Sequence, residues 1–160
     1  METKTNHNIP RVTFRVIDPS DNSSVNAAEW MAKPEEIRKT AEWISFETDR
    51  GDQFLMHKSA LPEAGWSTQQ KAAAKFHPKG RCGTRYEFLI VQYARENFET
   101  NLDELLSAIG GDTLREWFWT EEVVASYANS AWFFYGSYSG YLSYRSTRFS
   151  AYSARVFRAL

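Results

Sequence analysis

The last 38 residues of this 160-residue chain restrict its fold and function more than any other segment. All 20 aspartates and glutamates lie at or before Glu122, and residues 123–160 contain four arginines but no lysine and no acid. This tail also holds eight serines, six tyrosines and four phenylalanines. Its polar and apolar residues alternate loosely, and Gly136 and Gly140 are suited to turns. The pattern predicts short antiparallel strands joined by exposed loops.

The charge balance does not favour nucleic acid or a membrane as a partner. The net charge is −1, and the first 122 residues carry 15 basic against 20 acidic side chains. Arginine among aromatic residues can bind single strands by stacking, but the tail has no lysine for phosphate contacts. No run reaches the roughly 18 apolar residues that a membrane-spanning helix needs. The amino terminus has no apolar stretch typical of a secretory signal, so we expect synthesis in the cytoplasm and release, if any, by lysis, for example in a virion.

Residues that could carry chemistry are few. The single cysteine, Cys82, cannot form an intrachain disulfide and is expected to be a buried thiol. The three histidines do not have metal-ligand spacing, and there is no phosphate-binding glycine loop. We therefore expect no enzyme, no catalytic residue, no metal and no cofactor. Catalysis by His57, His77 or the pair Glu121-Glu122 is the minor alternative.

Local patterns predict the elements of the first half. The alternating β-branched run at 11–18 predicts a strand, and Pro34 is suited to the first turn of a helix over 34–43. Two alternating segments flank DRGD at 49–52, which predicts a hairpin. Apolar residues at 117–120, WFWT, predict a buried strand.

Three further helices are predicted by capping signatures, in which a short polar side chain precedes Gln or Glu by three residues. The expected caps are Ser67, Thr84 and Asn101. The corresponding helices are expected at 67–76, 84–95 and 102–109. Gly110-Gly111 suits the end of the last one, because glycine adopts the left-handed cap conformation readily.

Tyrosine and serine, with arginine at a few positions, are typical of antibody-type binding surfaces. Tyrosine brings a large amphipathic contact area at a low entropic cost, and serine brings small, adaptable hydrogen bonds. The tail has this composition, which favours protein recognition. An alternative interpretation is that Tyr and Ser simply alternate as the two faces of ordinary strands.

Several motifs resemble one known group of folds. Trp66, Ala72 and the run GRCGTRYE at 80–87 resemble the W-x-x-A…G-R-L-P-T-x-x-E signature of formylglycine-generating-enzyme-like C-type lectin folds. WFWTEE, NSAWFFYGSYSG and RVFRAL resemble bacterial and phage lectin-like domains close to the domain of unknown function 1566, which typically read W-x-W-T-S-T-E…AW…G…V-R-A-V. The match covers roughly residues 60–160. Cys82-Gly83 replaces Leu-Pro, Glu121-Glu122 replaces Ser-Thr-Glu, and the first 60 residues match no family that we can name.

The resemblance implies an α+β, C-type-lectin-like fold, with an antiparallel sheet and flanking helices over 61–160. Residues 1–60 lie outside the resemblance, and their local patterns predict a strand, helix and hairpin extension that could serve for assembly. One branch contains the variable proteins of diversity-generating retroelements, which include phage receptor-binding proteins at tail-fibre tips. Adenine-directed mutagenesis rewrites their C-terminal region, which corresponds here to a variable region at 123–154. Motifs for formylglycine formation and for calcium-dependent sugar binding are absent, so neither copper nor calcium is expected.

The genetic code provides a test that does not depend on the family. Replacing the adenines of an AAC codon can produce Asn, Tyr, Ser, Phe, Arg and ten other residues, but not Lys, Glu, Gln, Met or Trp. None of these five occurs in the 28 positions after Trp132. At ordinary usage several would be expected, so the tail fits codon-restricted diversification.

We therefore predict non-enzymatic recognition of a protein or glycan receptor on a cell surface, in phage receptor binding or bacterial adhesion, by a homo-oligomer such as a trimer. Trp117, Trp119 and Trp132 are assigned to the core, and Arg155 and Arg158 to scaffold contacts. The alternative is a structural or pilus-like subunit whose tail aromatics are buried between subunits. The candidate ligand-binding residues are Tyr127, Asn129, Ser130, Tyr135, Ser137, Tyr138, Tyr141, Ser143, Tyr144, Arg145, Ser146 and Tyr152.

Overall fold

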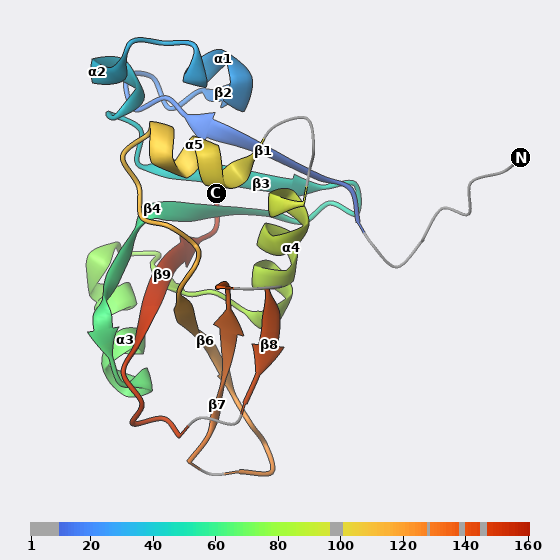
Figure 1. Ribbon diagram of the computed structural model, residues 1–160, viewed down its shortest axis with the longest axis vertical. Coiled ribbons are helices and arrows are strands. Elements are labelled where there is room, and N and C mark those ends of the chain that lie inside the picture. The colour runs from blue at the N-terminus through green and yellow to red at the C-terminus, as the bar shows by residue number, and fades with distance from the viewer. Residues whose placement is uncertain (1–9, 97–100, 128, 138–139, 145–146) are drawn as a thin grey trace, which may run out of the picture.

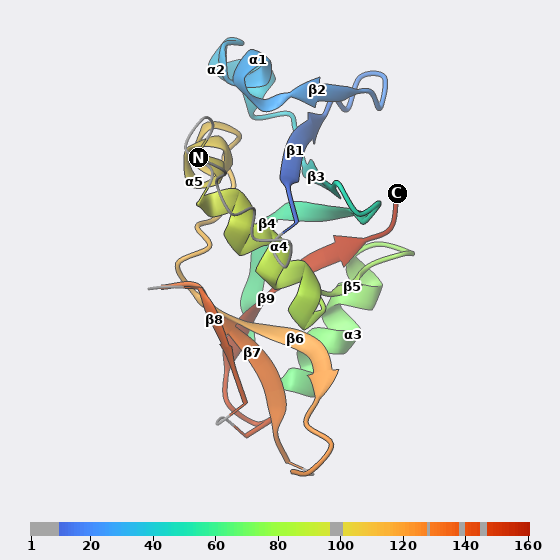
Figure 2. The ribbon, with the colours of Figure 1, turned by 90° about the vertical axis from the view of Figure 1, so that its right-hand side faces the viewer.

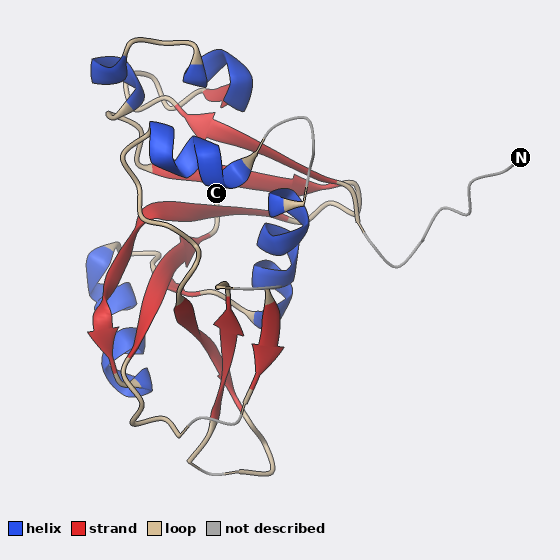
Figure 3. Ribbon diagram, in the orientation of Figure 1, coloured by secondary structure: helices blue, strands red, loops and turns tan. Residues whose placement is uncertain are grey.

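The computed structural model describes residues 10–96, 101–127, 129–137, 140–144 and 147–160, which form a mixed α+β fold with one large sheet and few helices (Figure 1, Figure 3). The strands are β1 (Val12–Ile17), β2 (Ser24–Asn26), β3 (Trp43–Thr48), β4 (Gln53–Ala64), β5 (Arg81–Cys82), β6 (Trp117–Val123), β7 (Ala131–Tyr135), β8 (Tyr141–Ser143) and β9 (Tyr152–Arg158). The helices are α1 (Ala27–Met31), α2 (Glu35–Arg38), α3 (Trp66–Phe76), α4 (Arg85–Arg95) and α5 (Leu102–Ala108). None of these helices is both long and apolar enough to cross a membrane.

The sheet runs in the order β2-β1-β3-β4-β9-β6-β7-β8, and β5 also pairs with β9. Neighbouring strands are antiparallel, except that β6 and β9 run parallel where Phe118 faces Ser153. The long strand β4 pairs with β3 through its first half and with β9 as far as Ala64, with two irregularities in register. Together β4 and β9 join the upper strands of Figure 1 to the small sheet β6-β7-β8.

The main hydrophobic core lies on the α4 and α5 side of the sheet, while α3 covers the other side (Figure 2). Phe88 of α4 packs against Phe118, Phe134 and Phe157, with ring centroids 6.1, 4.9 and 5.0 Å away. Successive residues of β9 alternate, so Val156 contacts the α3 side while Phe157 enters the main core. The expected boundary at residues 60 and 61 falls inside β4, and the main core contains side chains from both sides of it.

Local signals predicted the first strands well and the second helix poorly. The strand expected at 11–18 is β1, and the expected hairpin is β3–β4, where Gly51 adopts a φ of 88°. The helix expected over 34–43 is wrong in length, because α2 ends at Arg38. Trp43 instead pairs with His57 as the first residue of β3, so sheet pairing limits the helix.

The three capped helices are confirmed, with one correction. Thr84 forms a complete capping box with Glu87, and the Asn101 side chain accepts from the amides of Asp103 and Glu104. Helix α3, however, begins at Trp66, and its capping residue, Gly65, makes no side-chain hydrogen bond. Trp66 donates its backbone N–H to the Arg148 carbonyl and its ring N–H to the Thr120 carbonyl, at 2.8 and 2.9 Å. These tertiary bonds draw Trp66 into the first turn, so Ser67 is not the cap.

The tail forms β7, β8 and β9, as expected, and β9 is a buried central strand. Residues 153–157 are all buried between β4 and β6. The expectation of antiparallel strands alone is wrong at the parallel contact between β9 and β6.

Arg155 ties this strand to the rest of the fold. Its guanidinium is completely buried and donates to the carbonyls of Lys58, Asp112 and Thr113, the last two at 2.8 and 2.9 Å. Burial lowers the pKa of Arg155 to about 10. The guanidinium of Arg158 lies 4.6 Å from the ring centroid of Trp43. Both arginines therefore make the scaffold contacts expected of them.

Candidate ligand-binding surface

The strands β6, β7 and β8 form a small sheet whose two faces have different surroundings. Phe118, Phe134 and Leu142 lie opposite one another, on the side that α4 covers. The neighbouring residues point to the other side, because side chains alternate along a strand. Trp117 and Tyr141, which flank Tyr135 in the register, therefore lie on the face away from α4.

This second face is lined by rings from four strands, and we call it the aromatic face. Its members are Trp117, Phe133, Tyr135, Tyr141 and Tyr152. The Trp117 ring lies 4.7 Å from that of Tyr135 and 4.9 Å from that of Tyr152. The rings of Tyr135 and Tyr141 are 5.1 Å apart and nearly perpendicular. Trp117 and Tyr141 are 36% and 49% exposed.

The assignment of Trp117 to the core is thus wrong, whereas that of Trp119 is confirmed. Trp119 is fully buried, and its ring N–H donates to the carbonyls of Ala64 and Ser150, both at 3.2 Å. Both tryptophans lie on the same face of β6, and Trp119 is the one whose ring N–H reaches the Ser150 carbonyl in the segment that leads into β9. Burial on this face therefore ends between the two residues.

A second group of rings lies at the end of the sheet near the start of α4, and we call it the end cluster. It consists of Arg85, Tyr127, Trp132 and Tyr144. The Arg85 guanidinium lies 4.4 Å from the Trp132 ring, which is 4.7 Å from Tyr144. Tyr127 stacks on Tyr144 at 6.0 Å, and these two tyrosines are 57% and 40% exposed. Trp132 is only half-buried, so its assignment to the core holds in part.

Short hydrogen bonds fix the loops that surround these rings. Glu122 accepts from the backbone N–H and the Nε of Arg85, at 2.7 and 2.9 Å, which holds the cation of the end cluster. Ser130 forms an isolated bridge with Thr147. In the turn after β7, Gly136 donates to the Glu116 carbonyl, and the close approach of Leu114 leaves no room for a Cβ there. The exposed rings are therefore presented by a hydrogen-bonded frame.

The structure divides the predicted contact residues between these regions. Those on the aromatic face and its sheet are Tyr135, Tyr141, Ser143 and Tyr152. Those in the end cluster or the loops beside it are Tyr127, Asn129, Ser130 and Tyr144. Ser137 lies in the turn after β7 and donates to the Arg115 carbonyl at 3.1 Å. Tyr138, Arg145 and Ser146 lie outside the described residues.

Sequence reasoning missed three residues of this surface. The sequence pattern places Trp117 in the core and does not single out Arg148 or Phe149, although Phe149 is 85% exposed. Composition alone could have indicated Arg148 and Phe149, because both lie in the Tyr- and Arg-rich tail. Their position beside the start of α3 depends on a contact between distant segments, which the sequence pattern does not contain.

The surroundings of Cys82 and of the pair Glu121-Glu122 can be described from burial and charge. Burial raises the pKa of Cys82 to about 12, so its thiol is protonated at neutral pH. Burial also raises the pKa of Glu121, near Arg81 and Glu87, while Glu122 is paired with Arg85. Among the described residues, no group of three or more His, Cys, Asp or Glu could hold a metal ion.

His57 is packed among aromatic rings. It is 7% exposed and lies 4.9 Å from the Trp43 ring and 4.6 Å from the Phe76 ring. Its Nδ1 accepts from the Ser59 backbone N–H at 3.1 Å. Burial lowers the pKa of His57 below its ordinary value of 6.5, and the nearby carboxylate of Glu42 opposes this effect in part. These contacts give His57 a role in packing.

We expect His57 to make the protein less stable as the pH falls below about 6.5. The folded-state pKa is lower than the unfolded-state pKa, so below pH 6.5 the unfolded chain binds more protons and unfolding becomes easier. In His57→Gln this part of the pH dependence should be lost, while His77→Gln should retain it. Urea unfolding between pH 5 and 8, a range chosen to bracket the ordinary histidine pKa of about 6.5, measures the difference. Parallel pH profiles for the wild type and His57→Gln would contradict this assignment.

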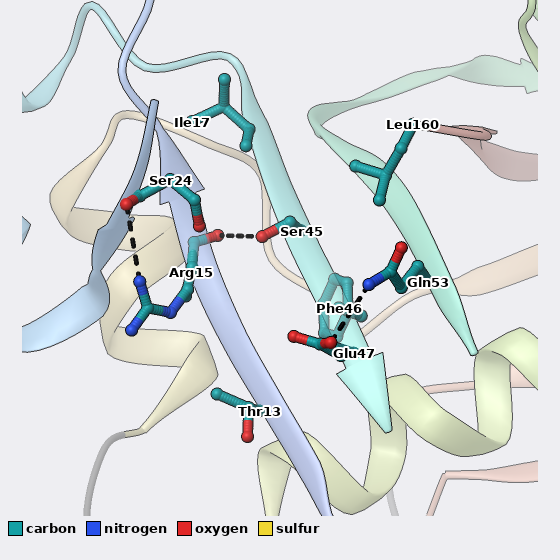
Figure 4. Close-up of a pocket in the computed structure, with 9 residues that line it drawn as sticks. All are labelled: Thr13, Arg15, Ile17, Ser24, Ser45, Phe46, Glu47, Gln53 and Leu160. Atoms are coloured by element: carbon teal, nitrogen blue, oxygen red, sulfur yellow. Dashed lines mark hydrogen bonds between the residues drawn. The ribbon is translucent and has the colours of Figure 1, made fainter. Parts of the chain in front are cut away.

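A separate hollow of about 190 Å³ lies on the outward face of β1, β3 and β4 (Figure 4). Its polar groups bind one another. Arg15 donates to the Ser24 carbonyl and Ser45 to the Arg15 carbonyl, both at 3.5 Å, and Gln53 donates to Glu47 at 3.1 Å. Of the tail only the last residue reaches it. This hollow is therefore a weaker candidate than the aromatic surface.

Comparison of the chain with protein-family models, with curated proteins and with solved structures gave no significant match. The function has therefore to be inferred from the residues of this chain and their arrangement.

Proposed function

We propose that this protein recognises a protein or glycan receptor on a cell surface through its C-terminal surface, without chemistry. The observation that carries the proposal is the concentration of exposed rings on a fixed frame. Of the ten large hydrophobic side chains that are exposed in the described part of the chain, six belong to 117–149. They are Trp117, Val123, Tyr127, Tyr141, Tyr144 and Phe149. Exposed patches of this kind mark interaction sites, and Tyr and Trp are frequent anchors in them.

The proposal includes a C-type-lectin-like fold for the C-terminal part of the chain. Three features support it. The strands β4 and β9 pair with each other, and α3, α4 and the small sheet lie between them in the order of the chain. Trp66 and Trp119, which carry part of the resemblance, make hydrogen bonds within this frame. Arg158 of the closing motif packs on Trp43.

The proposal also includes diversification of the tail, as in the variable protein of a retroelement. The codon restriction after Trp132 supports it, and so does the separation of buried from exposed positions. Buried tail residues such as Phe133 and Phe134 form the frame, while Tyr141 and Tyr144 project from it. Exchange of such exposed side chains usually changes stability little, which a diversified surface requires.

The triple variant Tyr127→Ser, Tyr141→Ser and Tyr144→Ser tests recognition directly. We expect it to lose at least about tenfold in binding to whichever surface the wild type binds in a panel of immobilised glycans and whole bacterial cells, since exposed tyrosines are common hot spots. Its melting temperature and oligomer size should be unchanged. The matched control replaces Thr13, Glu47 and Gln53 on the outward face of β1, β3 and β4 by alanine, and it should bind normally. Equal binding by the wild type and the tyrosine variant would refute the proposal.

A second function, assembly between copies of the chain, is favoured by one observation. Within the described part of the chain, strand β8 pairs with β7 alone and ends the sheet order, which leaves its other edge open for pairing, and Tyr141 belongs to this strand. If the tail aromatics are buried between subunits, the triple tyrosine variant will dissociate. Light scattering after gel filtration therefore separates the two functions, because the recognition proposal predicts an unchanged mass.

A further inference from the structure

A cavity of about 350 Å³ lies between the start of α3 and two segments of the tail. In Figure 1 the start of α3 and the segment leading into β9 meet at the lower end of the molecule. The volume is in the range of pockets that hold small ligands rather than flat protein surfaces. The cavity is lined by Gly65, Ser67, Thr68, Asn129, Arg148 and Phe149.

Among the described residues that line the cavity, Arg148 is the one with a charged side chain, and none of them is acidic. Its backbone N–H donates to the Asn129 carbonyl at 2.7 Å, and its own carbonyl accepts from Trp66 at 2.8 Å. Its Nε donates to the Ser130 carbonyl at 3.3 Å, and the guanidinium lies 5.2 Å from the Trp66 ring. Its two terminal nitrogens have no hydrogen-bond partner among the described residues. The guanidinium is therefore held in place at Nε, while its terminal N–H groups can donate to a ligand.

An anion bound to Arg148 would also meet the remaining lining residues, which indicate what other groups the ligand carries. Ser67 and Thr68 supply hydroxyls and Asn129 supplies an amide, all of which exchange hydrogen bonds with alcohol groups. Phe149 supplies a ring that is 85% exposed and can pack against an apolar surface. The amino-terminal end of α3 adds a weak attraction for an anion, which is secondary to the charge of Arg148.

We propose that this cavity binds an acidic sugar, that is, a monosaccharide unit with a carboxylate. The carboxylate would pair with the guanidinium of Arg148, a geometry that permits two parallel hydrogen bonds. The sugar hydroxyls would bind Ser67, Thr68 and Asn129, and the ring of Phe149 would cover a C–H face. This inference rests on the proposed recognition function and names the chemical class of its ligand.

The cavity wall combines a part of the chain that we expect to be constant in sequence with a part that we expect to vary. Gly65, Ser67 and Thr68 belong to the body, whereas Arg148 and Phe149 lie in the proposed variable region 123–154. An exchange of Arg148 during diversification would remove the cation and leave the hydroxyls in place. Tails without this arginine should therefore select neutral ligands at the same cavity.

Ligand-observed NMR with N-acetylneuraminic acid and glucuronic acid tests the inference on the full chain. We expect Kd values on the order of 1 mM for the acidic sugars, and binding of glucose and N-acetylglucosamine at least about tenfold weaker. Arg148→Gln should abolish the preference for acidic sugars, and Phe149→Ser should weaken binding of both classes. Arg15→Gln, an arginine in the other hollow, is the matched control and should bind like the wild type. Melting curves identify any variant that fails to fold. If Arg148→Gln does not fold, Phe149→Ser still tests whether sugars bind at this cavity, because the Phe149 side chain is exposed.

Three results would overturn the inference. Neutral sugars could bind as tightly as acidic ones, Arg148→Gln could retain the preference, or a blocked glutamate peptide could bind more tightly than either acid sugar. If acidic sugars fail but the triple tyrosine variant still loses receptor binding, the recognition function stands and only the cavity's ligand is wrong. If neither Arg148→Gln nor the triple tyrosine variant affects binding, the proposed recognition function fails as well.

Discussion

Replacing Arg155 by methionine will lower the free energy of unfolding by about 3–5 kcal/mol, because three hydrogen bonds from a charged group are lost. The side chain is completely buried, and its guanidinium donates to the carbonyls of Lys58, Asp112 and Thr113. Methionine fills a similar volume but donates no hydrogen bond, so the carbonyls of Asp112 and Thr113 would lose this donor. Among the described residues, the Lys58 carbonyl would keep only the Asp112 backbone N–H, at 2.9 Å. The bonds from Arg155 join β9 to β4 and to the segment before β6, so their loss loosens the connection between the two halves of the sheet.

Urea unfolding measures this effect, and Arg158→Met is the control. Arg158 lies on the same strand but is only half-buried, and its described contacts are the Trp43 ring and the Ala159 carbonyl. We expect the control to lose about 1 kcal/mol or less, the magnitude of a cation–π contact near the surface. A loss below about 1 kcal/mol for Arg155→Met would show that the three carbonyls find other partners, and that Arg155 does not hold the strands together.

The second large effect is expected for Trp119→Ala, which should destabilise the protein by about 3–5 kcal/mol. Trp119 is fully buried, its ring lies 4.7 Å from that of Tyr152, and its N–H satisfies the carbonyls of Ala64 and Ser150. Truncation leaves a cavity beneath the aromatic face and two carbonyls without this donor. The rings above it would lose their support.

Trp117→Ala is a closely matched control, because the same residue type lies two positions earlier on the same face of β6. Trp117 is 36% exposed and belongs to the aromatic face, so we expect its loss to cost about 1 kcal/mol while reducing ligand binding. Thermal and urea unfolding of both variants make the comparison. Equal destabilisation by the two substitutions would mean that Trp117 is part of the core after all.

Elements encoded by neighbouring residues could be predicted from the sequence. The capping box of Thr84 and Glu87 and the cap at Asn101 each involve residues within one helical turn, and both helices formed where expected. The β3–β4 hairpin likewise depends on two alternating segments around a short turn. Such signals do not need knowledge of the rest of the fold.

Features set by distant contacts could not be predicted. The early end of α2 depends on Trp43 pairing with His57, and the early start of α3 depends on a bond from Trp66 to the Arg148 carbonyl. The central place of β9 depends on pairing with a strand far earlier in the chain, as the register of Leu55 with Arg158, 103 positions apart, shows. Tertiary pairing overrides local preference in each case.

The candidate surface was predictable in composition but not in arrangement. The sequence predicts contact residues among the tail's tyrosines and serines, and the described tyrosines of that set are divided between the aromatic face and the end cluster. Alternation along β7 places Tyr135 and Trp132 on opposite sides of the small sheet, and only the strand register reveals which side stays uncovered. The cavity at Arg148 depends on the approach of α3, which the tail sequence does not contain.

Deep sequencing of this gene across a population of its source tests the central claim most directly. We predict that substitutions cluster within 123–154 at exposed positions such as Tyr127, Tyr141 and Tyr144, in codons whose variants encode Asn, Tyr, Ser, Phe and their relatives. Buried tail residues such as Phe133 and Phe134 should stay constant, as should residues 1–120. A tail that varies no more than the rest of the chain would contradict the account, and it would leave a fixed adhesin or an assembly subunit as the better description.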